Sequence, residues 1–299
     1  MGLERKLRIV ATSDMHIESE RNGLKAVEHA TEISQLIADV LVVIGDIGTP
    51  KEDVENVLKE LGKFPGEKLY VLGNHDLINL ENSKVPFHID ELNELLNKYD
   101  FHLLDNKPKV IEKIGFVGNI GWYNGDFFDF VKKNVKIKNG DPNNWVSALR
   151  KAGQILKNEE RYKGKLDPIL FSNLGFFYQN FKKLRKELRA YQKNDDVDYI
   201  VASTHYLPTE KLIAPEKFED FNYKGTYLGS NAIGKLYTKF PKLVLGLCGH
   251  DHSPIDDRRV FISDKPIYNV TAEKSKPYHI FDIMSDGSVK NQPTNNKKN

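Results

Sequence analysis

Five apolar segments of the sequence each end in side chains that can bind a metal ion. The segments are LRIVAT (7–12), VLVVIG (40–45), KLYVLG (68–73), YIVAST (199–204) and KLVLGL (242–247). The residues that follow them are Asp14, His16, Asp46, Asn74, His75, Asp76, His205, His250 and His252. Imidazole and carboxylate groups without a thiolate favour borderline metal ions such as Mn, Fe or Zn.

A single histidine beside a strand is more often a hydrogen-bonded structural residue than a metal ligand. Here, however, five of the nine histidines follow one of these segments, and five unrelated segments would each have to end this way by accident. The joint pattern therefore predicts two adjacent metal ions. Such a pair can hold the attacking and leaving oxygens of a phosphoryl displacement, and a carboxylate between them reduces their mutual repulsion.

The elements that must position these residues have an α/β pattern. The five segments are rich in β-branched residues and almost continuously apolar, which is typical of strands buried on both faces. Residues 24–38, 51–63 and 88–100 have helical patterns, 101–120 predict short strands, and 265–270 and 278–290 predict further strands. In open α/β sheets ligands bind at the carboxyl ends of the strands, where all of these polar residues fall.

The order of the motifs, D-x-H, G-D, G-N-H-D, H and G-H-x-H, resembles the calcineurin-like metallophosphoesterase superfamily. The motifs run from Asp14 to His252 and so span most of the chain. The resemblance implies a four-layer α/β fold, in which a two-sheet β sandwich is flanked by helices. It also implies a metal-dependent phosphoester hydrolase with two divalent or trivalent ions, either Mn, Fe or Zn.

The resemblance further implies roles for the individual residues. One ion would be held by Asp14, His16, Asp46 and His252 and the other by Asp46, Asn74, His205 and His250, with Asp46 bridging. His75 would be the catalytic histidine that protonates the leaving oxygen, and Asp76 would orient its imidazole.

The sequence departs from the family pattern at the second motif. Many members have G-D-x-x-D there, whereas this chain has GDIGT, with Thr49 at a position that is not a direct ligand. The protein Ser/Thr phosphatases of the superfamily carry GNHE and a longer GDxVDRG motif, and this chain has neither. The GNHD form is shared by phosphodiesterases, small-molecule phosphatases and nucleases.

Residues 121–196 predict a mostly helical, basic insertion or cap on a single domain of residues 1–290. Between Lys132 and Lys193 there are sixteen Lys and Arg against five Asp and Glu, a local net charge of +11 in a chain whose net charge is +2. Helical spacing of Phe177, Leu184 and Leu188 favours an amphipathic helix that packs on the core. The aromatic stretch 121–130 is better explained by packing than by stacking on a base.

These observations favour a phosphatase or phosphodiesterase that acts on a small phosphorylated molecule or nucleotide. The alternative is a nuclease whose basic insertion grips phosphates, so nucleic acid is the alternative partner. A catalytically silent binding module is disfavoured because every expected ligand is present. The single cysteine, Cys248, excludes an internal disulfide and favours the cytoplasm. No apolar run approaches the ~20 residues of a membrane span, and the polar residues 291–299 predict a disordered tail.

Overall fold

The computed structural model describes residues 3–17, 23–48, 51–77, 89–127, 173–213, 225, 227–252, 258–273 and 276–293. The strands in these ranges form two six-stranded sheets. The first sheet contains β1 (Arg5–Thr12), β2 (Val40–Ile44), β3 (Glu67–Val71), β4 (Phe101–Leu103), β11 (His279–Met284) and β12 (Val289–Gln292). The second contains β5 (Lys109–Ile111), β6 (Ile114–Asn119), β7 (Tyr199–Thr204), β8 (Leu243–Cys248), β9 (Arg259–Ile262) and β10 (Lys265–Asn269).

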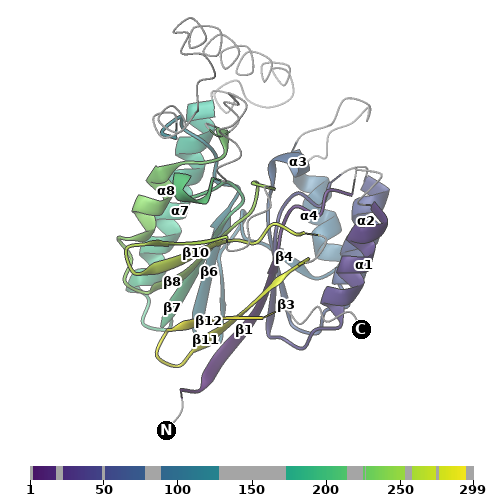
Figure 1. The fold of residues 1–299 in the computed structure, drawn as a ribbon, viewed down its shortest axis with the longest axis horizontal. Helices are drawn as coiled ribbons and strands as arrows, with labels where there is room; N and C mark the ends of the chain where they lie inside the picture. Colours follow the sequence, from purple (N-terminus) through teal and green to yellow (C-terminus); the bar gives the residue numbers. More distant parts are fainter. Residues whose placement is uncertain are drawn as a thin grey trace, which may run out of the picture.

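Helices cover the outer face of each sheet, which makes four layers (Figure 1). The helices are α1 (Gly23–Ser34), α2 (Lys51–Leu61), α3 (Asn74–Leu77), α4 (Ile89–Lys98), α7 (Asn173–Lys193), α8 (Asn231–Tyr237) and a short 3-10 helix, η2 (Glu210–Leu212). One hydrophobic cluster joins α1, α2 and α4 to the first sheet, a second joins α7 and α8 to the second sheet, and a third lies between the sheets. The predicted four-layer α/β sandwich is confirmed.

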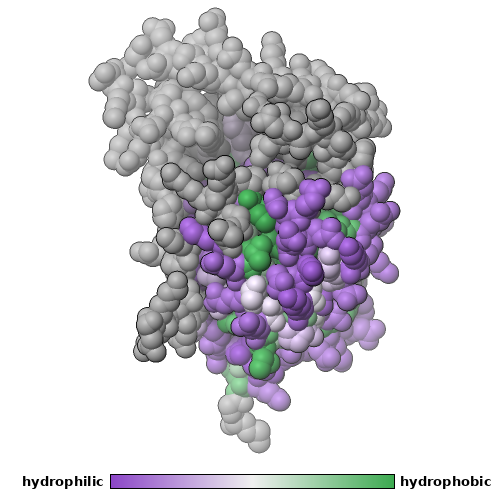
Figure 2. Space-filling view, turned by 90° about the vertical axis from the view of Figure 1, so that its right-hand side faces the viewer, coloured by the Kyte–Doolittle hydropathy of each residue, from purple (hydrophilic) through white to green (hydrophobic). Residues whose placement is uncertain are grey.

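The strands are almost continuously apolar because both of their faces are buried. In β2, Leu41 and Val43 pack under the helices, whereas Val40, Val42 and Ile44 pack between the two sheets. Burial of each such side chain stabilises the fold by about 1.5–3 kcal/mol. The outer surface of the helices on the first sheet is mostly hydrophilic, as expected for amphipathic helices (Figure 2).

Parallel pairing brings the carboxyl ends of the predicted strands to one edge of the sandwich. β1, β2, β3 and β4 are parallel neighbours in the first sheet. β6, β7, β8 and β10 are parallel neighbours in the second sheet. The five segments that end in polar residues are therefore divided between two sheets, three in one and two in the other.

The described parts of the predicted insertion are its two ends, residues 121–127 and 173–196. Helix α7 packs against β6 and β7, and Phe177, Leu184 and Leu188 are buried in the cluster beneath it. The prediction of an amphipathic helix on the core is confirmed for α7. Residues 128–172, which carry most of the predicted basic insertion, lie outside the described residues.

The end of the chain differs from the prediction at one point. β12 continues to Gln292, two residues into the segment 291–299 that was predicted to be disordered. Asn291 pairs with Phe281 and Gln292 with Ile280 on β11, so backbone pairing holds these polar residues. Residues 294–299 lie outside the described residues. Across the described ranges, no helix combines the length and the apolar character that a membrane span requires.

Candidate metal centre

Backbone hydrogen bonds join the loops that follow the strands. The N–H groups of Asp14 and His16 donate to the carbonyls of Gly45 and Asp46, each at 3.1 Å. The loop after β8 is tied to the loop after β7, since Gly249 N donates to the His205 carbonyl at 3.0 Å. The backbone N–H of His250, after β8, also donates to the Asp14 carboxylate, after β1, so the loops after β1, β2, β7 and β8 form a connected rim across both sheets.

The carboxylate of Asp14 presents one oxygen to the protein and the other to histidines. Its Oδ2 accepts the backbone N–H of His250 at 2.9 Å and lies 3.0 Å from the hydroxyl oxygen of Thr271. Its Oδ1 lies 3.0 Å from His252 Nε2 and 3.6 Å from His16 Nε2. The protein therefore fixes the carboxylate plane and leaves Oδ1 facing two imidazoles.

Asp46 repeats this arrangement. Its Oδ1 accepts the backbone N–H of His75 at 2.8 Å. Its Oδ2 is buried and accepts no hydrogen bond of acceptable geometry from the described residues. The nearest ligand nitrogens are His205 Nε2 at 3.1 Å and His16 Nε2 at 3.9 Å. A buried carboxylate oxygen in this state is costly unless a cation compensates its charge.

The surroundings of His205 show why its side chain, with those of Asn74 and Asp46, fits a metal ion. Its Nδ1 lies 2.8 Å from the Ile44 carbonyl, which can only accept, so Nδ1 carries the hydrogen. In the neutral ring Nε2 then has a lone pair, which points at two acceptors, Asn74 Oδ1 at 3.0 Å and Asp46 Oδ2 at 3.1 Å. In this neutral form, which a metal ion requires, three electron-rich atoms would converge with no hydrogen between them, and a cation at this point would satisfy all three.

A second convergence lies beside the first. His16 Nε2 and His252 Nε2 are 3.0 Å apart, and His252 Nε2 is also 3.0 Å from Asp14 Oδ1. Three groups of side chains bring their donor atoms within 4.8 Å of one another: Asp14, His16 and His252; His16, Asp46 and His75; Asp46, His205 and His250. These groups contain six of the seven predicted metal ligands, and the seventh, Asn74, lies 3.0 Å from His205 Nε2, so all seven gather at one edge.

The two buried aspartates supply the negative charge that a bound cation requires. Burial alone would raise the pKa of Asp14, but the positive charge of His205 and hydrogen bonds from His16 and His252 hold that pKa well below its usual range. Burial lowers the pKa of His205, yet the charges of Asp46 and Asp14 outweigh this effect and raise it to about 9. Burial and the neighbouring His205 charge lower the pKa of His250 to about 3. A metal ion would have to displace the proton from His205, whereas His250 is already neutral.

The backbone at these residues is also unusual. Asp14, His16, Asp46 and His250 have φ angles of 58°, 43°, 54° and 71°, in the left-handed region that non-glycine residues seldom adopt. Such conformations persist only where the surroundings enforce them, and they cluster at functional sites. Their coincidence with the predicted ligands supports a functional role for this edge.

His75 and Asp76 lie within the short helix α3. The ring of His75 lies edge-on to that of His16, with centroids 4.6 Å apart. Oδ2 of Asp76 accepts hydrogen bonds from Tyr70 Oη at 2.9 Å and Gly73 N at 2.8 Å, and a longer one from Asp46 N at 3.3 Å. These contacts show that Asp76 holds the loop; the predicted orientation of the His75 imidazole by Asp76 stays a prediction.

Three residues near the centre were missed by the sequence reasoning. Thr271 contacts Asp14, Asn269 Oδ1 accepts the N–H of Thr271 at 3.0 Å, and Arg258 Nη1 donates to the Asp251 carbonyl at 2.8 Å. Asn269 and Thr271 lie at the end of β10, a predicted strand parallel to β8. The rule that found the other residues, polar groups at a strand's carboxyl end, would have found these two as well.

An aromatic cluster lies next to the metal centre. The Tyr206 ring lies 4.1 Å from that of His250 and 4.6 Å from that of Trp122. Trp122 also contacts Phe176 at 4.9 Å, and Tyr123 contacts Tyr227 at 5.1 Å. Trp122 and Tyr123 therefore pack among aromatic side chains and Phe127 is buried in the cluster beneath α7, so packing explains this stretch as expected from the sequence.

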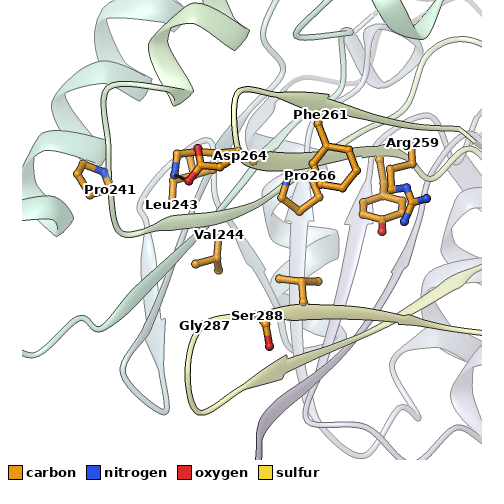
Figure 3. Close-up of a pocket in the computed structure, with 12 residues that line it drawn as sticks. Pro241, Leu243, Val244, Arg259, Phe261, Asp264, Pro266, Gly287 and Ser288 are labelled. Carbon is orange, nitrogen blue, oxygen red and sulfur yellow. Dashed lines mark ion pairs between the residues drawn. The ribbon is translucent and has the colours of Figure 1, made fainter. Parts of the chain in front are cut away.

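A pocket of about 280 Å³ lies away from these residues (Figure 3). It is lined by the beginnings of β8 and β10, by Arg259 and Phe261 of β9, and by the turn between β11 and β12. Leu243, Val244, Lys265 and Pro266 lie at the amino ends of β8 and β10, away from the edge where the ligand atoms converge. The pocket contains no residue of the metal centre.

Comparisons with known proteins agree with this geometry. No match was found among curated proteins. The crystal structure of phosphopantetheinyl hydrolase from Mycobacterium tuberculosis is similar with a TM-score of 0.62 and 16% identity, over 91% of this chain and 90% of that one. A dimetal phosphatase from Danio rerio is similar with a TM-score of 0.52 and 10% identity, over 96% and 99%. At these identities the likeness shows a shared fold.

The sequence comparison identifies the family. The calcineurin-like phosphoesterase profile matches residues 7–254, from β1 to just beyond His252. This range includes every residue of the metal centre that the sequence predicted. The chain belongs to the calcineurin-like metallophosphoesterase family of metal-dependent phosphoester hydrolases.

Proposed function

We propose that the chain is a phosphatase or phosphodiesterase that hydrolyses a small phosphorylated molecule or nucleotide at a dinuclear centre. One observation carries the proposal. Asp14 and Asp46 each have one oxygen bonded to the protein and the other turned toward imidazole nitrogens. Hydrogen bonding of this kind orients metal-ligating carboxylates in proteins.

The proposed ligands divide into two sets that share Asp46. One ion would be held by Asp14, His16, Asp46 and His252, and the other by Asp46, Asn74, His205 and His250. Nitrogen and carboxylate donors without a thiolate suit Mn, Fe or Zn. When bound, two such ions would supply electrostatic stabilisation to the phosphoryl oxygens of the substrate.

His75 is the proposed proton donor to the leaving oxygen. Its backbone N–H is fixed on Asp46 Oδ1 at 2.8 Å, and its ring lies against that of His16. Both contacts hold it directly beside the proposed ligands. General acids of this kind contribute about 10²–10⁴-fold to a rate. Asp76 is proposed to keep the His75 loop in place and to orient its imidazole.

The substrate class is argued from the surroundings of the centre. Trp122, Tyr206 and their aromatic neighbours form one side of it, and apolar side chains of this kind line small-molecule sites. The nuclease alternative depends on the basic segment 132–193, of which residues 132–172 lie outside the described residues. In α7, which is the described part of this segment, the apolar side packs on the second sheet. This contact explains the helix without a nucleic-acid ligand, so it does not favour the nuclease alternative.

The proposal is tested with protein stripped of metal by EDTA and reloaded with Mn²⁺, Fe²⁺ or Zn²⁺. Each form is assayed on phosphomonoesters, cyclic nucleotides, dinucleotides, a phosphopantetheinyl ester and short oligonucleotides. The phosphopantetheinyl ester is included because one structural neighbour is named as a phosphopantetheinyl hydrolase. We expect turnover of a small substrate only in a form that holds two ions per chain.

Two results would oppose this proposal. Folded, metal-loaded protein that cleaves none of these esters would refute hydrolysis of this class. Preference for oligonucleotides, with binding that weakens steeply as salt rises, would replace the small-molecule substrate with nucleic acid. His102→Ala serves as a control, because His102 is a histidine outside the centre whose Nε2 contacts the Lys107 carbonyl.

A further inference from the structure

We propose that Asp105 is a positioning residue for the second ion, because its two carboxylate oxygens clamp one loop from each sheet. The inference rests on the proposed function, which assigns Asn74 and His205 to that ion. Asp105 follows β4, the edge strand of the first sheet, and precedes β5, the edge strand of the second. It therefore lies on the connection that crosses between the sheets.

Each oxygen of Asp105 binds a different sheet. Oδ2 accepts the backbone N–H of Leu72 at 2.8 Å, and Leu72 directly follows β3. Oδ1 accepts the backbone N–H of Ile120 at 2.8 Å, and Ile120 directly follows β6. One carboxylate thus holds the ends of two strands that belong to different sheets.

Both bonds lead within two residues or one further hydrogen bond to the proposed second site. Leu72 is two residues before Asn74 in the same loop. On the other side, the Ile120 carbonyl accepts the N–H of Tyr206 at 3.1 Å, and Tyr206 is the neighbour of His205. Between the two loops, Asn74 Oδ1 lies 3.0 Å from His205 Nε2. Asp105 therefore closes a ring of contacts that sets the separation of these two ligands.

A carboxylate is the group that suits this position. Both of its oxygens accept, so two N–H groups that approach from different sheets are satisfied at once. Burial raises the pKa of Asp105 to about 6, while the N–H groups of Leu72 and Ile120 and the charge of Lys183 oppose that rise. An asparagine of the same shape offers one acceptor only, and its amide would face one of the two N–H groups.

The first ion would be held by different contacts. Asp14 is fixed by the His250 N–H and by Thr271, and His16 N donates to the Asp46 carbonyl. None of these contacts involves Asp105. The clamp therefore predicts a selective effect, in which loss of Asp105 weakens the second ion and leaves the first unchanged.

The test is a calorimetric Mn²⁺ titration of metal-free wild type, Asp105→Asn and Asp126→Asn. Asp126 is a matched control, because its carboxylate also accepts two backbone N–H groups, those of Asn231 and Ala232 at 3.0 and 3.1 Å, but at the start of α8. We expect Asp105→Asn to weaken the second Mn²⁺ by about 10–100-fold, the usual effect of removing an outer partner of a metal site. The first Mn²⁺ should keep its wild-type affinity, and excess Mn²⁺ should restore turnover.

The outcomes separate the clamp from the proposed function. Wild type that binds fewer than two ions overturns the dinuclear centre itself. If wild type binds two ions and Asp105→Asn binds both of them as tightly, the clamp is overturned but the dinuclear centre is not. Equal weakening of both ions, or weakening in Asp126→Asn as well, assigns a general structural role to Asp105 and also overturns the clamp. If Asp105→Asn does not fold, Asp105→Glu, which displaces the carboxylate by one methylene, takes its place.

Discussion

The phenol of Tyr70 donates a hydrogen bond of 2.9 Å to Oδ2 of Asp76, and both side chains are buried. The same oxygen accepts the N–H groups of Gly73 at 2.8 Å and Asp46 at 3.3 Å. Burial and then the charge of Asp46 raise the pKa of Asp76 to about 7, while the bonds from Gly73 and Tyr70 oppose that rise. A single carboxylate oxygen thus joins the loops after β2 and β3.

Tyr70→Phe removes this hydroxyl and keeps the ring. We expect the free energy of unfolding at pH 8, where Asp76 is charged, to fall by about 2 kcal/mol, since a buried hydrogen bond to a charged group contributes about 1.5–3 kcal/mol. Turnover should fall as well, because the loop carries Asn74 and His75. Urea unfolding and steady-state kinetics measure the two effects. Tyr199→Phe is the control, because it loses a Tyr hydrogen bond of 2.9 Å to the Ser285 carbonyl, far along the sequence from either loop. Wild-type turnover in Tyr70→Phe would contradict the assigned role.

Asp46→Asn should reduce the binding of both ions, because Asp46 is the proposed bridge and its Oδ2 faces His205 and His16. Asp14→Asn should mainly reduce one ion, since Asp14 belongs to a single proposed set. Elemental analysis of purified protein gives the number of ions per chain. Two ions retained by Asp46→Asn would argue against a bridging carboxylate.

His75→Ala should keep two ions per chain and lose about 10²–10⁴-fold in turnover. The loss should be largest for an ester with a poor leaving group, such as an alkyl phosphate. It should be much smaller for a 4-nitrophenyl ester, whose leaving oxygen needs no proton. Parallel kinetics on the two esters measure the difference. An equal loss on both would show that His75 acts in another way than as a proton donor.

Much of the fold could be predicted because the signals are local. The apolar runs before Asp14, Asp46 and His205 became β1, β2 and β7, with ends within two residues of the predicted ones. The sequence pattern by itself did not divide these strands between two sheets, since a strand buried on both faces has the same composition in either; the family resemblance supplied the sandwich. Asp105 was also missed, because its two partners lie 33 and 15 residues away and no local pattern marks it.

Gly45→Ala should disrupt the centre through a backbone clash. Gly45 has φ +69°, and a Cβ there would lie 2.2 Å from the backbone nitrogen of Gly73. The loops after β2 and β3 pass each other at this point, so they would have to separate. Gly125→Ala is the matched control, because Gly125 has a similar φ of +84° but nothing within 4 Å of the added Cβ. Left-handed backbone costs an alanine about 1–2 kcal/mol at either position. Calorimetric Mn²⁺ binding should be weakened in Gly45→Ala only; equal binding in both variants would show that the close approach is unimportant.

Glu187→Gln should change how stability depends on pH. Glu187 is 9% exposed on α7, its Oε2 has no hydrogen-bond partner among the described residues, and its Oε1 lies 3.9 Å from Lys183 Nζ. Burial raises the pKa of Glu187 from 4.5 to about 7, the charge of Lys183 opposes this, and that of Asp105 adds to it. Because the folded pKa exceeds the unfolded one, the folded state binds more protons between about pH 4.5 and 7. Stability from this group is therefore lost as the pH rises through that window.

Glutamine has no such titration, so Glu187→Gln should gain stability relative to wild type at pH 8 but not at pH 5. The gain should be about 1 kcal/mol. The full pKa difference at ~1.4 kcal/mol per unit would give roughly 3 kcal/mol, but solvent reaches part of this side chain and reduces the effect. Urea unfolding in EDTA at the two pH values measures it without the pH dependence of metal binding. Glu94→Gln on the exposed face of α4 controls for the loss of a glutamate charge. A difference between wild type and Glu187→Gln that is the same at both pH values would mean that Glu187 titrates normally in the folded chain.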